Sequence, residues 1–294
     1  MENHSKRIVA PKWIDALKLM RIPFSIFLMA VFWFALINIE VDISSAILVF
    51  ITIHLFLYPA SNGYNSYFDR DEQSIGGLKN PPAVTKELWY LILLFDFLSI
   101  LTASFVNPLF AAMIFIYMLV SKAYSYKRIR LKKLPIIGAL TVVTFQGFWI
   151  YLAVQCGASK FPFLNSQNLI LGIVSSLFLL GSYPMTQIYQ HEEDQRQGDR
   201  SLSLMLGING TFVFSALVFF IASALMIFVF VQQQKLLNVG IYLLALIPVN
   251  IYFLKWYSDF RKGKAVITYE RTMRLNQISS LSLSAAFIIM KVLG

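Results

Sequence analysis

Charged residues are scarce in this chain of 294 residues. They make up 14% of it, against about 25% in an average soluble protein. Hydrophobic residues account for 57%, and the mean hydropathy is +0.65. This composition excludes a soluble fold and is typical of a polytopic membrane protein. Cysteine is nearly absent as well, because Cys156 stands alone, which excludes an internal disulfide. No short apolar core with a small-residue cleavage site follows the basic, polar start, so we expect no cleaved signal peptide.

Nine apolar stretches are each long enough to cross a bilayer, which takes about 20 mostly apolar residues. They use most of the chain and leave no room for a soluble domain, so we expect one integral membrane domain over residues 1–294. Backbone polar groups must be paired within each spanning segment, and the predicted fold class is therefore all-α, a polytopic membrane bundle of nine transmembrane helices. The expected spans are 22–39, 43–62, 88–106, 108–125, 135–156, 168–188, 209–231, 237–255 and 275–293.

The distribution of Lys and Arg predicts the orientation of this bundle. With a cytoplasmic N-terminus, 22 of the 25 basic residues fall in inside segments, and only Lys160, Lys235 and Lys291 lie outside. This asymmetry explains the net charge of +10 without nucleic acid as a partner. Residues 1–21 are expected to form an N-terminal segment in the membrane interface, since residues 10–21 mix apolar and basic positions.

The second span leads into a polar stretch, residues 62–82, which puts an amide and three carboxylates at the end of that span. Asn65, Asp69 and Gln73 are spaced four apart, so a helix that continued through them would place all three on one face. Asp71 and Glu72 follow closely, and oxygen ligands of this kind suit Mg²⁺, which also keeps waters and substrate phosphates. The alternative is a solvated loop with ordinary charges.

A second acidic stretch follows the sixth span on the same predicted side of the membrane. Gln190 and Asp194 are again four apart, and Glu192 and Glu193 lie between them. His191 beside these carboxylates favours a helix-surface or supporting role over direct metal binding. If the two acidic stretches face each other, a central cavity opens near two acidic cytoplasmic loops.

Six cations and two tyrosines lie between the acidic stretches, in residues 122–133. One interpretation is anchoring by the positive-inside rule alone. The other is phosphate binding, with Arg supplying forked donors and Lys a point charge. Two acidic stretches and one basic stretch on a single face form the charge layout that a metal–diphosphate complex needs.

Asp96 is a separate case, because it lies in the middle of the third predicted span, where a charge is costly. It either makes a helix–helix contact or lines the cavity, and the first role is favoured.

Three ordered motifs on this nine-span frame resemble the UbiA superfamily of intramembrane prenyltransferases. The family's first motif, N-D-x-x-D-x-x-x-D, is similar to residues 65–73. Its middle element is similar to Tyr124-Ser125 with Arg130-Leu131-Lys132, in the style of the chlorophyll synthase and geranylgeranylglyceryl phosphate geranylgeranyltransferase branches. Its second motif is similar to residues 190–202. Ser66, Gln73 and Gln190 stand where the family commonly has Asp.

The resemblance implies a Mg²⁺-dependent prenyltransferase, which moves a prenyl group from a polyprenyl diphosphate donor to a lipophilic acceptor through an allylic carbocation. The acceptor would be aromatic, a quinone precursor or a lipid. Asp69 and Asp194 are the implied catalytic residues. The implied metal ligands are Asn65, Asp69, Asp71, Glu72, Gln190, Glu193 and Asp194. The implied diphosphate-binding residues are Lys79, Tyr124, Lys127, Arg128, Arg130, Lys132 and Arg200.

Two other functions remain open from the residues. A terpene cyclase of the same family type would use the same ionisation without an acceptor. A non-catalytic transporter or cation-binding factor would only bind cations at the acidic clusters, but ion-coupled transporters usually place their acids at the bilayer midplane. For the enzyme we expect a multi-pass protein of the cell (inner) membrane, in contact with the lipid bilayer and with its active-site loops on the cytoplasmic side.

Overall fold

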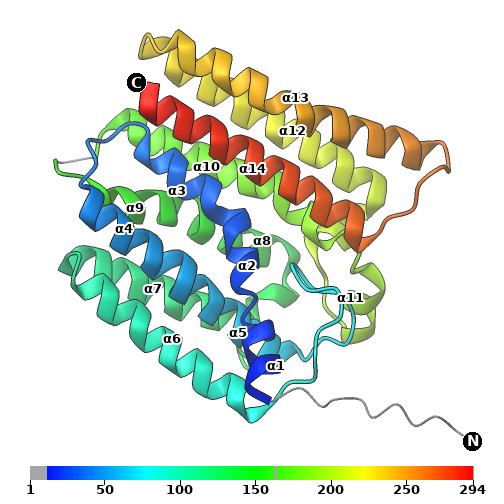
Figure 1. The fold of residues 1–294 in the computed structure, drawn as a ribbon. Coiled ribbons are helices and arrows are strands. Elements are labelled where there is room, and N and C mark those ends of the chain that lie inside the picture. The colour runs from blue at the N-terminus through cyan, green and yellow to red at the C-terminus, as the bar shows by residue number, and fades with distance from the viewer. Residues whose placement is uncertain (1–11, 162–163, 294) are drawn as a thin grey trace, which may run out of the picture.

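The computed structural model describes residues 12–161 and 164–293, which form a bundle of packed helices (Figure 1). Within this part, nine helical segments are long and apolar enough to cross a membrane, so the predicted number of spans is confirmed. The observed spans are Lys12–Leu36, Ile43–Asp69, Lys86–Ser104, Pro108–Ser125, Pro135–Ala158, Ser166–Gln187, Leu202–Gln232, Leu236–Arg261 and Tyr269–Leu293.

Several spans consist of more than one helical segment. The first contains α1 (Lys12–Leu19), α2 (Ile22–Ser25), η1 (Ile26–Leu28) and α3 (Met29–Leu36). The second contains α4 (Ile43–Phe50), the π-helical η2 (Ile51–Leu57) and α5 (Tyr58–Asp69), and the fifth contains α8 (Pro135–Val143), the π-helical η4 (Thr144–Trp149) and α9 (Ile150–Ala158). The remaining elements are α6 (Lys86–Ser104), α7 (Pro108–Ser125), η3 (Leu131–Lys133), α10 (Ser166–Gln187), α11 (His191–Gln197), α12 (Leu202–Gln232), α13 (Leu236–Arg261) and α14 (Tyr269–Leu293).

The helix of the second span continues past the expected end at residue 62 and ends at Asp69, before it reaches Gln73. Arg70 takes the left-handed conformation, with φ of 55°, and its N–H bonds to the carbonyl of Ser66. This is the usual way for a helix to end, and the chain then leaves the helix axis. The prediction that Gln73 shares a helical face with Asn65 and Asp69 is therefore wrong, although the four-residue pair Asn65–Asp69 does lie on α5.

The first and last spans are neighbours in the bundle, with α14 packed against α3 and α13 (Figure 1). Phe34 on α3 contacts the last span and a third helix: its ring centroid lies 4.9 Å from that of Phe287 on α14 and 5.3 Å from that of Tyr151 on α9. These rings belong to the largest buried apolar cluster of the described residues, which spans most of the bundle. The polypeptide thus closes on itself around its core.

One end of the bundle gathers the polar connections that matter for function. The non-helical connection 70–85 and the short helix α11 lie side by side there (Figure 1), joined by a hydrogen bond of 3.1 Å from Gln190 Nε2 to the carbonyl of Ser74. The predicted N-terminal segment 1–21 is described only from residue 12, and residues 1–11 lie outside the described part. Helix α1 packs against α6 and leaves Trp13, Ile14 and Leu17 exposed, which is typical of an interfacial helix.

Candidate functional site

A cavity of about 310 Å³ opens at this polar end and reaches between the helices. Its walls come from the turn between α1 and α2, from α5, α7, α8, η4 and α10, and from α11 and α14. The lining includes seven of the predicted site residues, drawn from all three sequence motifs: Asn65, Asp69, Asp71, Tyr124, Lys132, Gln190 and Asp194. The two acidic stretches and the basic stretch therefore do meet, as the sequence analysis expects.

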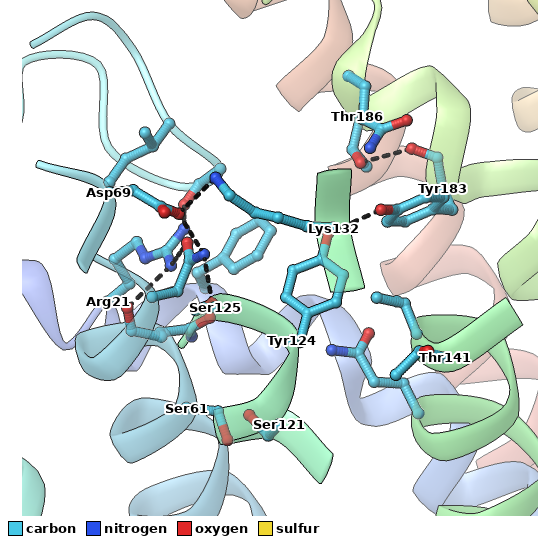
Figure 2. A pocket seen from close by; sticks show the side chains of 18 of the residues that line it. Arg21, Ser61, Asp69, Ser121, Tyr124, Ser125, Lys132, Thr141, Tyr183 and Thr186 are labelled. Carbon is cyan, nitrogen blue, oxygen red and sulfur yellow. Dashed lines mark hydrogen bonds and ion pairs between the residues drawn. The ribbon is translucent and has the colours of Figure 1, made fainter. Parts of the chain in front are cut away.

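Asp69 lies at the C-terminal end of α5 and is held by side chains from two other elements. Its Oδ2 accepts a hydrogen bond of 2.5 Å from Asn65 Nδ2 and lies 2.9 Å from Lys132 Nζ. Asn65 also donates to Ser125 Oγ at 3.0 Å, which ties α5 to α7 (Figure 2). The other oxygen, Asp69 Oδ1, is buried and accepts no hydrogen bond within the described part of the chain.

Lys132 connects Asp69 to a second carboxylate, Asp199. Its Nζ lies 3.0 Å from Asp199 Oδ2, and Arg130 reaches the same carboxylate with both Nε and Nη2, at 3.2 and 2.9 Å. Burial alone lowers the pKa of Lys132, but the carboxylates of Asp69 and Asp199 outweigh burial and raise that pKa above its usual value. Lys132 is therefore held as a buried, fully charged cation at the mouth of the cavity.

Asp194 projects into the same cavity from α11. Burial raises the pKa of this carboxyl to about 6, against the opposing effects of a hydrogen bond from Ser201 and of the charge on Lys132. Its Oδ2 is buried and accepts no hydrogen bond from any described residue. A buried carboxylate with an unused oxygen fits a cation, because burying an anion is costly unless the anion is paired.

Tyr124 lies in the cavity wall between the charged region and the interior of the bundle. Its hydroxyl lies 2.8 Å from that of Tyr183 on α10, and Thr186 on the same helix donates to the carbonyl of Tyr183 at 2.7 Å (Figure 2). Tyr183 and Asp199 are site residues that the sequence motifs do not single out. Asp199 lies within residues 190–202 but at a position where the motif specifies no residue, and Tyr183 lies in an apolar span with no distinguishing pattern.

Arg21 is a further cation of the cavity that sequence reasoning missed, because it was assigned to interfacial anchoring. It is only 8% exposed and lies at the turn between α1 and α2, with a left-handed φ of 51°. Its guanidinium donates to the carbonyls of Asn62 and Gly76 at 3.1 and 3.3 Å and to Asn65 Oδ1 at 3.4 Å. Arg21 thereby joins the first span, α5 and connection 70–85 at the cavity wall.

Seven of the predicted site residues do not line the cavity. Arg130 stands directly behind it, bound to Asp199. Lys79 pairs with Glu270 on α14, and Arg196 pairs with Glu193 and, at 3.7 Å, with Glu72. These pairs fasten connection 70–85 to α11 and α14. Lys127, Arg128 and Arg200 are exposed, as positive-inside anchors would be.

The donor set is suited to a hard cation. In the described part of the chain no three His, Cys, Asp or Glu side chains converge closely enough to hold a metal by themselves. Asp69 and Asp194 nevertheless both line one cavity, and each has a buried oxygen that accepts no hydrogen bond from a described residue, although Asp69 Oδ1 lies 3.9 Å from Arg130 Nη2. Mg²⁺ is commonly held by one or two carboxylates together with substrate phosphates and water, so the residues fit this ion in the presence of a phosphate ligand.

Two residues left open by the sequence have defined roles. Asp96 on α6 forms an ion pair with Lys122 on α7 and does not line the cavity, so the predicted helix–helix contact is confirmed. His191 pairs with Ser203 on α12, at 2.8 Å between Nε2 and Oγ.

Membrane-length helices around a cavity with a charged mouth and a more apolar interior define an integral membrane protein with an internal binding site. The sequence profile of the UbiA prenyltransferase family matches residues 26–278. The chain therefore belongs to this family, whose members are prenyltransferases. The resemblance based on the three motifs is confirmed.

Solved structures support the same fold assignment. A UbiA homologue from Archaeoglobus fulgidus bound to GPP and Mg²⁺ has a TM-score of 0.70 and 18% identity, covering 95% of this chain and 99% of that one. A UbiA homologue from Aeropyrum pernix K1 has a TM-score of 0.69 and 18% identity over 91% and 98%. A structure of digeranylgeranylglyceryl phosphate synthase has a TM-score of 0.57 and 20% identity over 95% and 99%. No curated protein matches the chain.

Proposed function

We propose that this protein transfers a prenyl group from a polyprenyl diphosphate to a lipophilic acceptor in a Mg²⁺-dependent reaction. In this reaction the bond between the allylic carbon and the diphosphate oxygen breaks, and its electron pair leaves with the diphosphate. The allylic cation then bonds to a nucleophilic atom of the acceptor, which loses a proton to the released diphosphate. The protein acts as one membrane-embedded unit over residues 1–294, in the cell membrane, with its charged cavity mouth on the cytoplasmic side.

One observation carries this proposal: Asp69, Asp194 and Lys132 line a single cavity, and each of the two carboxylates has a buried oxygen that accepts no hydrogen bond from a described residue. Opposite charges in this arrangement suit a diphosphate with a bound cation. The Archaeoglobus fulgidus homologue, which shares the fold, binds GPP and Mg²⁺. In this chain Asp69 and Asp194 would hold Mg²⁺, with Asn65, Asp71 and Gln190 beside them. The ion would neutralise the charge of the diphosphate as it leaves.

The remaining steps depend on residues of the chain itself. Lys132 and Arg21 hold diphosphate oxygens that the ion leaves free, and Tyr124 donates a hydrogen bond from the adjoining wall. Phe24, Phe27 and Phe145 line the cavity together with Leu28 and Leu179. They provide an apolar surface for the isoprenoid tail, aromatic faces that stabilise a cation, and a barrier to water that would otherwise quench it.

The first prediction concerns the two carboxylates that define the site. Purified protein with Mg²⁺ and geranylgeranyl or farnesyl diphosphate is expected to release diphosphate. Asp69→Asn or Asp194→Asn is expected to lower this rate by at least about 100-fold, because a neutral amide holds Mg²⁺ far more weakly. Asp259→Asn is the matched control: this acid lies on α13 and does not line the cavity, so its rate should match that of wild type.

The products of the same assay separate the competing functions. An adduct that forms only with an added acceptor supports transfer, whereas a hydrocarbon or terpene alcohol formed without one supports a terpene cyclase. If wild type releases no diphosphate under any condition, or if both cavity variants behave like Asp259→Asn, the enzyme proposal is wrong and cation binding without catalysis takes its place.

A further inference from the structure

Charge is confined to one part of the cavity wall. Its charged lining residues are Arg21, Asp69, Asp71, Lys132, Asp194 and Asp199. All of them come from segments at the polar end of the bundle: the α1–α2 turn, the end of α5, connection 70–85, η3, α11 and the loop after it. In Figure 2, Asp69 and Arg21 lie together on one side, and the side chain of Lys132 reaches towards them.

Both cations in this charged part of the wall already bind oxygens of the protein. Lys132 bridges two carboxylates, and Arg21 donates three hydrogen bonds to oxygens of α5 and connection 70–85. A diphosphate bound at this mouth would accept the remaining hydrogen bonds that both cations can donate. No described lining residue would then be left to serve as a positive partner for a second anion.

The wall formed by α8, η4 and α10 differs, because none of its lining residues carries a charge. It presents only hydroxyl and amide groups among apolar side chains: Thr141, Gln146, Ser182, Tyr183, Thr186 and Gln187. Figure 2 shows Thr141, Tyr183 and Thr186 on the side away from Asp69 and Arg21, with Tyr124 between the two groups. These side chains lie on membrane-spanning helices, from Thr141 and Gln146 within the fifth span to Gln187 at the end of the sixth.

The neutral wall is held in place by a tight contact between two spans. In η4, Gly147 lies so close to α10 that a Cβ built on it would be 2.6 Å from Ser176 Cα. Ser176 Oγ donates to the carbonyl of Val143 and accepts from the N–H of Phe148, at 2.8 and 2.9 Å. The wide helical turn that carries Gln146 is therefore fixed on both sides, and π-helical turns of this kind often occur at functional sites.

An acceptor that entered beside the prenyl group would meet this neutral wall. A carboxylate or phosphate there would lose its water and gain no counter-charge, which strongly disfavours its burial. A hydroxyl group would find both donors and acceptors of hydrogen bonds. We propose that the acceptor presents an uncharged hydroxyl group, as an alcohol or phenol without an acidic substituent, to the wall formed by α8, η4 and α10. This inference rests on the proposed function.

The test compares acceptors in matched pairs that differ in one charged group. The pairs are 4-hydroxybenzyl alcohol with 4-hydroxybenzoate, 1,4-dihydroxynaphthalene with its 2-carboxylate, and geranylgeranylglycerol with its phosphate. Each is offered to the purified wild-type protein with Mg²⁺ and geranylgeranyl diphosphate, and the prenylated adduct is quantified. We expect adduct from at least one neutral member, with kcat/KM at least about tenfold above that of its charged partner. Equal or greater use of the charged partner in every pair overturns the proposal, and so does the absence of adduct from all neutral members.

A charge placed on the neutral wall gives the reverse experiment. Gln146→Lys is expected to raise kcat/KM for 4-hydroxybenzoate by at least about tenfold relative to wild type, because the ammonium supplies the missing partner. Gln146→Met, of similar length and without charge, is the matched control and should give no such gain. If Gln146→Lys folds and ionises the donor but gains nothing over Gln146→Met, the neutral wall does not select the acceptor. If Gln146→Lys fails to fold, the comparison of neutral and charged acceptors with the wild-type protein still decides the proposal.

The two proposals fail in distinguishable ways. Mg²⁺-dependent release of diphosphate, measured with each acceptor and without one, reports on the proposed function alone. A protein that releases diphosphate through Asp69 and Asp194 yet prenylates charged acceptors would keep the first proposal and lose the second. A protein that releases none would lose both.

Discussion

Lys132 is the residue on which the charge balance of the cavity depends most directly. It is largely buried and lies within 3.0 Å of oxygens from two separate carboxylates, Asp69 and Asp199. Removal of one member of such a buried group leaves the opposite charges unpaired, which is more costly than the loss of a surface ion pair. In the proposed reaction the lysine would therefore both position Asp69 and supply a cation to the diphosphate.

The neighbouring residue Lys133 allows a controlled test of this role. Lys132→Met is expected to lower kcat/KM for diphosphate release by about 10- to 100-fold, the usual range for the loss of a hydrogen bond between charged groups. Lys133→Met should stay within about twofold of wild type, because Lys133 is exposed and does not line the cavity. Steady-state kinetics with geranylgeranyl diphosphate provide the measurement, and equal effects of the two substitutions would contradict the assigned role.

At this scale the sequence predicts Asp69 and Asp194 more reliably than the residues that surround them in the cavity. Asp69 and Asp194 follow from motif spacing, since carboxylates at the ends of apolar spans stand out. Asp199 and Arg21 do not follow in the same way. The contact of Asp199 with Arg130 joins residues 69 positions apart, and the burial of Arg21 depends on a left-handed turn that no residue pattern indicates. Lys127, Arg128 and Arg200 fit the same basic pattern as Lys132, yet they are exposed.

Among the elements, the contact between η4 and α10 is the one least tolerant of added atoms. Gly147→Ala would place a methyl group 2.6 Å from Ser176 Cα and 2.7 Å from Ser176 N, both of them backbone atoms that cannot rotate away. We expect the substitution to lower the free energy of unfolding by about 1–3 kcal/mol, the usual cost of overpacking. Thermal unfolding in detergent measures the effect as a lower Tm.

Gly240→Ala is the matched control for this substitution. Gly240 lies on α13, and a Cβ there would meet no atom within 4 Å. Because Ala favours helix over Gly by about 1 kcal/mol, the control should be neutral or slightly stabilising. A Tm for Gly147→Ala at or above that of Gly240→Ala would show that η4 can move away from α10.

The ion pair between Asp96 and Lys122 links α6 to α7 within the membrane-spanning segments. Lys122 Nζ also lies 4.6 Å from the ring centroid of Tyr64 on α5, so three helices meet at this cation. Asp96→Leu alone should destabilise the protein by about 1–3 kcal/mol, because it leaves the partly buried ammonium of Lys122, whose side chain is 25% exposed, without its carboxylate. Combining it with Lys122→Met should restore most of that loss. The measurement is a double-mutant cycle on Tm, and purely additive effects would contradict the pairing.

Hydropathy predicts that the spans exist, but it does not predict the residues at which their helices begin and end. The seventh span was expected from residue 209, and the regular part of α12 does begin close to it, after a break at Gly207 where φ is 67°. The short helical segment before the break starts at Leu202, and a bond of 3.0 Å between the hydroxyls of Ser203 and Thr211 joins the two parts inside the bundle. The helix of the second span ends at Asp69, because the left-handed backbone of Arg70 stops it there. Apolar length thus predicts that a span exists, and local polar contacts determine where it ends.

At the scale of the whole molecule, the number of spans follows from composition, but the arrangement of helices around the cavity does not. The orientation in the membrane is still a prediction from 22 inside and 3 outside basic residues. It can be tested with single cysteines in a Cys156→Ser background, labelled by a maleimide that does not cross membranes. Lys160→Cys should react in intact cells, and Lys133→Cys only after permeabilisation. The reverse pattern would invert the topology.

Because the first and last spans are neighbours, the cavity is contributed by residues from nearly the whole length of the chain. Arg21 and Asn276 both line it, and α3 packs on α14. During synthesis, every earlier helix enters the membrane before the last partner of α3 exists. The complete binding site is therefore absent from nascent chains that lack α14. The contact between the first and last spans therefore forms late in biogenesis. A chain without its last span would be inserted in the membrane, but its bundle would stay open.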